Sequence, residues 1–128
     1  MSLVDANIVL RYLLNDQQEL SAKAFEIIKN NKSVVLTEVL CEIVYVLQKV
    51  YNVPKKEIQT NLSDLINESV IIVEQQDIII QALLIYSKIS IDIVDAILWA
   101  YHVVDGKKIF TLDDKLNRCL NSQKIIEK

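Results

Sequence analysis

The sequence predicts an α/β fold, with a central parallel sheet of four or five strands flanked by helices. Two observations carry this prediction. Short runs rich in Val, Ile and Leu alternate with longer amphipathic segments at least four times along the chain, as in proteins whose parallel strands are joined by helices. The 128 residues, 52% of them hydrophobic, suit one compact domain over residues 1–128 with no linker or internal repeat.

The first strand and the first two helices are predicted from a change of period. Residues 2–5 (SLVD) have strand character, and residues 6–14 (ANIVLRYLL) change to helical spacing, with Asp5 at the junction. Residues 19–31 form a second amphipathic segment that ends in two asparagines, which suit a helix terminus.

The middle of the chain repeats this order. Residues 33–36 (SVVL) read as a buried strand, and Thr37 is a suitable N-cap for a helix over 38–51. Pro54 fits the first turn of the next helix, within residues 52–68.

A third strand and two apolar helices follow. Residues 69–73 (SVIIV) are strand-like, Asp77 can cap a helix over 78–88, and Asp92 can cap a helix over 93–104. The segments around VLCEIVYVL and IIIQALLIYSK are more apolar than one covered face requires. Either they leave an apolar patch that a second copy or another protein covers, or both are buried within the monomer.

The C-terminal part predicts one clear strand and a short helix. Asp105 and Gly106 end the preceding helix, and residues 107–112 (KKIFTL) read as the last clear strand. A short helix begins at Asp114, and residues 124–128 (KIIEK) are a further edge strand.

Composition excludes several classes of site. Gly106 is the only glycine, so neither a dinucleotide-binding nor a P-loop motif is present. His102 is the only histidine and has no nucleophile motif around it, so we expect a packed or half-exposed helix residue. Cys41 and Cys119 lack the spacing of a zinc site. The net charge of −3 argues against coating nucleic acid by charge alone, although an acidic metal site is compatible with a nuclease.

No apolar run reaches the roughly 18 residues that a membrane span requires. The opening segment carries Asp5 and Arg11, where a signal peptide would be uncharged. We therefore expect a soluble, cytoplasmic protein that does not bind membranes.

Acidic residues follow the predicted strands. Asp5 ends the first strand, and Asp113 and Asp114 end the last, so both ends bring carboxylates to the rim where open parallel sheets bind ligands. Asp95 lies in the first turn of the helix that Asp92 opens. Each of these acids has a simpler interpretation as a helix cap or first-turn acid.

Glu42 interrupts an apolar run and has no basic residue at helical spacing on its N-terminal side. A carboxylate buried there would need a cation. Glu38, one turn earlier, can face the same way. Acids without His or Cys suit Mg²⁺ or Mn²⁺, and we expect clustered carboxylates to have raised pKa values without metal.

Four segments, in this order, resemble the motifs of a PIN domain, in particular a VapC-type toxin: LVDANIVLRYLL, LTEVLCEIVYVLQKVY, IDIVDAILWA and FTLDDKLNR. They are spread across nearly the whole chain, from residue 3 to residue 118. The first motif of the family typically reads Asp-Thr-Asn, and this chain has Ala6 in the middle with Asn7 retained. In the last motif a second acid, Asp114, stands where a lysine or similar residue is common.

The resemblance implies a three-layer PIN-like fold and a site for Mg²⁺ or Mn²⁺. The positions that match the metal-binding and catalytic acids of the family are Asp5, Glu42, Asp95 and Asp113. Supporting positions are Asn7, Thr111, Asp114, Glu38 and Asp92.

The resemblance further implies an endoribonuclease whose metal activates water, and a cognate antitoxin that holds it off. We also expect a homodimer, because a second copy of the chain would cover the predicted apolar patch. The basic residues that follow site acids closely enough to contact RNA phosphates are Arg11, Lys115 and Arg118. The alternative is a catalytically silent PIN-like module that dimerises or binds an antitoxin.

Overall fold

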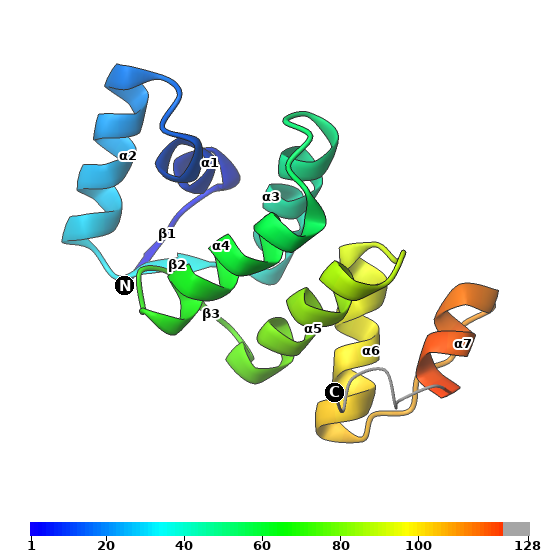
Figure 1. Ribbon diagram of the computed structural model, residues 1–128. Coiled ribbons are helices and arrows are strands. Elements are labelled where there is room, and N and C mark those ends of the chain that lie inside the picture. Colours follow the sequence, from blue (N-terminus) through cyan, green and yellow to red (C-terminus); the bar gives the residue numbers. More distant parts are fainter. Residues whose placement is uncertain (122–128) are drawn as a thin grey trace. The chain divides into compact units, whose positions relative to one another are not determined.

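The computed structural model describes residues 1–121. The described chain divides into two compact units, the first over residues 1–76 and the second beginning at residue 77. The predicted edge strand at 124–128 lies outside the described residues. Figure 1 shows the order of the elements along the chain. None of the described helices is long and apolar enough to span a bilayer.

The first unit contains a parallel sheet of three short strands in the order β1-β2-β3. The strands are β1 (Ser2–Leu3), β2 (Ser33–Val35) and β3 (Ile72–Val73). Leu3 pairs with Val34, and Val34 pairs with Ile72, so these three side chains lie next to one another on one face of the sheet. A hollow borders this face, and Leu3 is 68% exposed there. Val35 and Val73, on the other face, are buried in the core.

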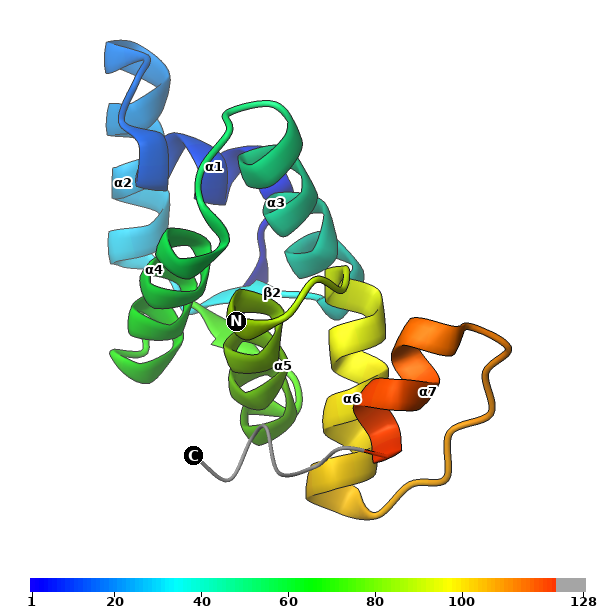
Figure 2. The same cartoon turned by 45° about the vertical axis from the view of Figure 1, so that its right-hand side comes forward.

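Four helices complete the first unit: α1 (Ala6–Leu14), α2 (Gln18–Asn30), α3 (Thr37–Lys49) and α4 (Lys55–Asn67). α1 packs against α2 and α3, and α3 packs against α4 (Figures 1 and 2). The predicted cap at Thr37 is one residue off, because Leu36 is the N-cap and Thr37 already belongs to α3. Pro54 is the N-cap of α4 and so directly precedes its first turn.

The second unit is helical in the part that the structure describes. It contains α5 (Gln76–Lys88, whose first residue belongs to the first unit), α6 (Ile93–Asp105) and α7 (Asp114–Asn121). α6 ends as predicted at Gly106, which has φ 68° and whose N–H donates to the carbonyl of His102. Asp77 lies within the first turn of α5 and does not precede the helix as an N-cap would.

The prediction of a strand at 107–112 is wrong for the described structure. The described sheet has three strands, where the sequence predicts four or five. A strand requires a hydrogen-bonded neighbour, and residues 107–112 pair with none of the described strands. Phe110 is 84% exposed and Leu112 is fully exposed. The strand-like composition of residues 107–112 therefore does not lead to a place in the described sheet.

Of the two apolar helices, α5 buries its large side chains, with Ile78, Ile79, Leu83, Ile85 and Tyr86 in the core. This favours the simpler interpretation of α5 as a monomer core helix. α3 differs, because Tyr45 on this helix and Val50 at its C-cap are both exposed.

Candidate active site

Asp5 stands between β1 and α1, at the strand end where the sequence predicts it. Its Oδ1 accepts a hydrogen bond from the backbone N of Ile8 at 3.1 Å, so Asp5 is also the N-cap of α1. The two interpretations of this acid are compatible, since capping occupies one carboxylate oxygen and the side chain is exposed. Asn7 is exposed in the first turn of α1.

Glu42 is exposed, so the expectation of a carboxylate in apolar surroundings is wrong. α3 buries Leu40, Ile43, Val44 and Leu47, and Glu42 lies between these positions on the outer face of the helix. Glu38, four residues earlier, is exposed on the same face. The first unit therefore presents both α3 acids to solvent.

Asp92 and Asp95 occupy the start of α6. Asp92 Oδ1 accepts a hydrogen bond from the backbone N of Asp95 at 2.9 Å, which makes Asp92 the predicted N-cap. Asp95 is half-buried. Burial raises the pKa of the Asp95 carboxyl above its ordinary value, and the charges of Asp92 and Asp113 raise it further. Burial, and then the charge of Asp92, also raise the pKa of the Tyr86 hydroxyl on α5, to about 12.

Asp113 directly precedes α7. Its Oδ2 accepts from the backbone N of Leu116 at 3.0 Å, and its own N–H donates to Thr111 Oγ1 at 3.0 Å. Thr111 therefore supports Asp113 through a hydrogen bond to the main chain. Asp114 is exposed as the first residue of α7.

The second unit thus brings Asp92 and Asp113 near enough to Asp95 for their charges to raise the pKa of the Asp95 carboxyl. Within residues 1–121 none of the three forms a salt bridge. Asp92 and Asp113 each use one oxygen for a backbone N–H, and the second oxygen accepts no hydrogen bond from another described residue. A cation bound beside Asp95 would offset the burial and the two neighbouring charges that raise the pKa of this carboxyl.

The described residues contain no group of three or more His, Cys, Asp or Glu side chains arranged to hold a metal ion. Electrostatic coupling acts over longer distances than metal coordination, so this finding is consistent with the raised pKa of Asp95. The donor chemistry of the predicted acids fits Mg²⁺ or Mn²⁺, because both ions prefer carboxylate oxygen.

The three basic residues predicted to contact RNA differ in their surroundings. The Arg11 side chain is 5% exposed and forms a salt bridge from Nη1 to Asp16 Oδ1 at 2.6 Å. Its Nη2 donates to the Tyr51 hydroxyl at 2.9 Å, which raises the pKa of the guanidinium. Lys115 and Arg118 are exposed on α7, three residues apart and so on one face. The structure therefore gives Arg11 internal partners and leaves the two α7 residues accessible.

Two groups of residues were not predicted from the sequence. The Arg11–Asp16–Tyr51 contacts join segments up to 40 residues apart, so local patterns do not show them. Asn117, whose Nδ2 donates to the Thr111 carbonyl at 3.0 Å, lies one helical turn after Asp113. That spacing is visible in the sequence and would have indicated Asn117.

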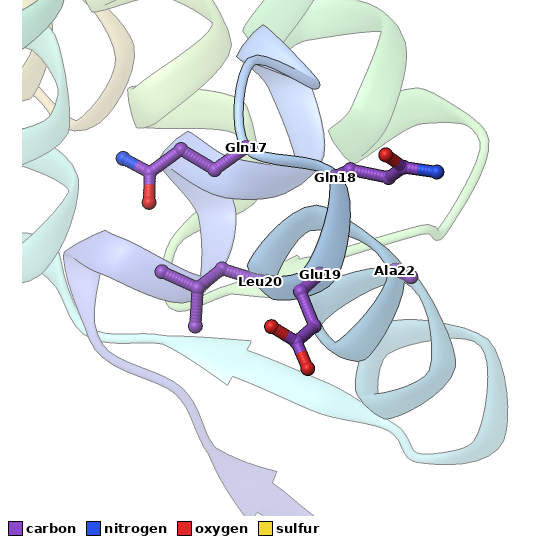
Figure 3. Close-up of a pocket in the computed structure, with 5 residues that line it drawn as sticks. All are labelled: Gln17, Gln18, Glu19, Leu20 and Ala22. Carbon is purple, nitrogen blue, oxygen red and sulfur yellow. The ribbon is translucent and has the colours of Figure 1, made fainter.

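One of the hollows on the first unit lies at the start of α2, where it is lined by Gln17, Gln18, Glu19, Leu20 and Ala22 (Figure 3). It contains none of the predicted site residues. The hollow along the strands, described above, is mainly apolar and contains none of them either.

Comparison with known proteins identifies the family. The PIN domain model matches residues 2–119, a range that spans both units and all four motifs. Searches of curated proteins and of solved structures gave no significant match. PIN domains are typically nucleases that use divalent metals. Because the match covers far more than half of the chain, this protein belongs to the PIN domain family.

Proposed function

We propose that this protein is a divalent-metal-dependent endoribonuclease, the cytoplasmic VapC-type toxin of a toxin-antitoxin pair, with residues 1–128 as a single PIN domain. The observation that carries the proposal is the acid cluster of the second unit. Asp95 is half-buried beside the charges of Asp92 and Asp113, and none of these acids pairs with a described basic residue. Such an arrangement is unfavourable for stability and is typical of a site that binds a cation.

We propose Asp5, Glu42, Asp95 and Asp113 as the metal-binding and catalytic carboxylates. A bound Mg²⁺ or Mn²⁺ supplies an activated water and charge stabilisation at the phosphate. Asp5 and Asp113 keep the orientation of one carboxylate oxygen fixed through their capping bonds to Ile8 N and Leu116 N. This leaves the second oxygen of each for a ligand.

The supporting residues act on the orientation of these acids or add charge. Asp92 caps α6 and so fixes the turn that carries Asp95, and Thr111 holds the main chain of Asp113. The remaining supporting residues are the exposed Asn7, Glu38 and Asp114.

The test of this function is cleavage of a mixed pool of structured RNAs by purified protein in Mg²⁺, Mn²⁺ or EDTA. We expect cleavage with either ion and none in EDTA. The same ions should raise the thermal midpoint, because an ion that binds only the folded state stabilises it by about 2.7 kcal/mol at 100 times its Kd. A metal-free protein that neither cleaves RNA nor changes its midpoint would favour the silent interaction module.

RNA binding is expected to depend on Arg118. Replacing Arg118 by Gln should weaken RNA binding most at low salt. The slope of the logarithm of the binding constant against the logarithm of the salt concentration should become shallower by about the contribution of one phosphate contact. Lys56→Gln, an exposed change on α4, is the matched control. Binding would be measured by fluorescence anisotropy in EDTA across a salt series, and equal salt slopes for parent and Arg118→Gln would contradict the assignment. Lys115, on the same face of α7, is a second proposed contact; Arg11 is better explained by its bond to Asp16.

The proposed partners are an RNA substrate, an antitoxin and a second copy of the chain. The exposed apolar residues Tyr45 and Val50 of the first unit are compatible with protein contacts. Light scattering of the purified protein distinguishes a dimer from a monomer.

A further inference from the structure

Asp113 is held by a small hydrogen-bond network on the second unit. Its N–H donates to Thr111 Oγ1, and its Oδ2 accepts from Leu116 N, both at 3.0 Å. Asn117 closes the network, because its Nδ2 donates to the backbone carbonyl of Thr111 at 3.0 Å. The main chain before Asp113 is thus held by a hydroxyl group and by an amide from the following turn.

The side-chain bond of Asn117 is not needed to start α7. Asp113 already caps the helix, and the backbone N of Asn117 donates to the Asp113 carbonyl at 3.0 Å as an ordinary helical bond. The half-buried Asn117 side chain instead reaches back past the first turn to the preceding loop. Its contribution is therefore to fix the loop relative to the helix, with Asp113 at the junction.

We propose that Asn117 is a positioning residue for the Asp113 carboxylate, acting through the main chain of Thr111. One oxygen of Asp113 is committed to Leu116 N, so the direction of Oδ1 depends on the backbone of residues 111–113. The Asn117 amide fixes that backbone from the helix side. The consequence for catalysis rests on the proposed function, because it assumes that Asp113 binds the metal.

The positioning itself can be measured without metal. Amide hydrogen exchange, followed by NMR, is compared in the parent, Asn117→Ala and Asn117→Asp. The Asp variant is close in shape but has no N–H group to donate to the Thr111 carbonyl. We expect the Asp113 amide to exchange about fivefold to tenfold faster in both variants, as for the loss of one neutral hydrogen bond. Asn121→Ala, at an exposed position at the end of α7, is the control.

Kinetics then test the consequence. With metal, Asn117→Ala should lower kcat for RNA cleavage about tenfold, as for other residues that orient metal ligands, while KM changes less than about twofold. If Asn117 only stabilised the fold, its replacement would lower the fraction of active protein and would leave the exchange rate of the Asp113 amide unchanged. Parent-like exchange at Asp113 in both variants would overturn the inference.

The two proposals can fail separately. If the parent protein does not cleave RNA, the proposed function fails, and the exchange of the Asp113 amide still decides whether Asn117 positions that residue. If the parent cleaves RNA and Asn117→Ala has the same kcat, Asn117 has no part in catalysis and the proposed function stands.

Discussion

Replacing Asp95 by Asn is expected to lower the rate of metal-dependent RNA cleavage by at least about 100-fold. Loss of a group that only orients a metal ligand already costs about 10–100-fold, and Asp95 is proposed as a ligand itself. Single-turnover cleavage of a defined RNA at saturating Mn²⁺ measures the chemical step. Asp105→Asn is the matched control, since it makes the same change at the exposed C-terminal end of the same helix.

The same variant should be more stable than the parent when metal is absent. The pKa of Asp95 is raised in the folded protein, so the ionised carboxyl disfavours folding. This penalty is absent below the ordinary Asp pKa of about 3.9. It develops as the pH rises from there through the raised folded value, and it is complete above that value.

Asp95→Asn should therefore raise the free energy of unfolding at pH 7, and this gain should disappear in acid. Urea unfolding of both proteins in EDTA, across a pH series, measures the difference. A variant that is more stable and yet inactive would exclude misfolding as the cause of lost cleavage. Near-parental cleavage by Asp95→Asn would remove Asp95 from the site.

The second large effect concerns stability and lies in the first unit. Replacing Asp16 by Ala is expected to lower the free energy of unfolding by about 2–4 kcal/mol, because it leaves the buried charge of Arg11 without its ion-pair partner. Within the described residues, Arg11 Nε already lacks a hydrogen-bond partner. Tyr51 would remain as the only acceptor among the contacts that the structure gives.

A double-mutant cycle separates the charge from the packing. Arg11→Met keeps most of the side-chain volume without a charge, so it should cost less than Asp16→Ala. Adding Asp16→Ala to Arg11→Met should then cost little more. Urea unfolding at pH 7 measures all four proteins. Equal effects of Asp16→Ala in both backgrounds would show that the ion pair contributes nothing.

Sequence reasoning succeeded where the signal was local. The caps at Asp5 and Asp92 and the end of α6 at Gly106 each depend on bonds that span only three to five residues. His102, expected to be packed or half-exposed, is half-exposed and lies 2.8 Å from the Lys107 carbonyl through Nδ1. The nature and position of these residues determine such contacts directly.

Sequence reasoning failed where the environment of a residue depends on helix geometry or on a segment far away in the sequence. The environment of Glu42 was inferred from adjacent residues, but adjacent residues on a helix point in different directions, and the buried positions of α3 lie on another face. The strand at 107–112 depends on pairing with a distant segment, which its own composition cannot supply. The bond between Arg11 and Tyr51 likewise joins residues 40 positions apart.

The short span of the capping bonds has a consequence for the order of events during folding. Asp5, Asp92 and Asp113 each bind a backbone N–H three residues ahead. Such a contact closes almost no loop, so it forms on the time scale of the helix itself and before contacts between distant segments. Each of these carboxylates therefore acquires its direction early, from its own helix. The later, slower steps of folding then bring together carboxylates whose orientation is already fixed.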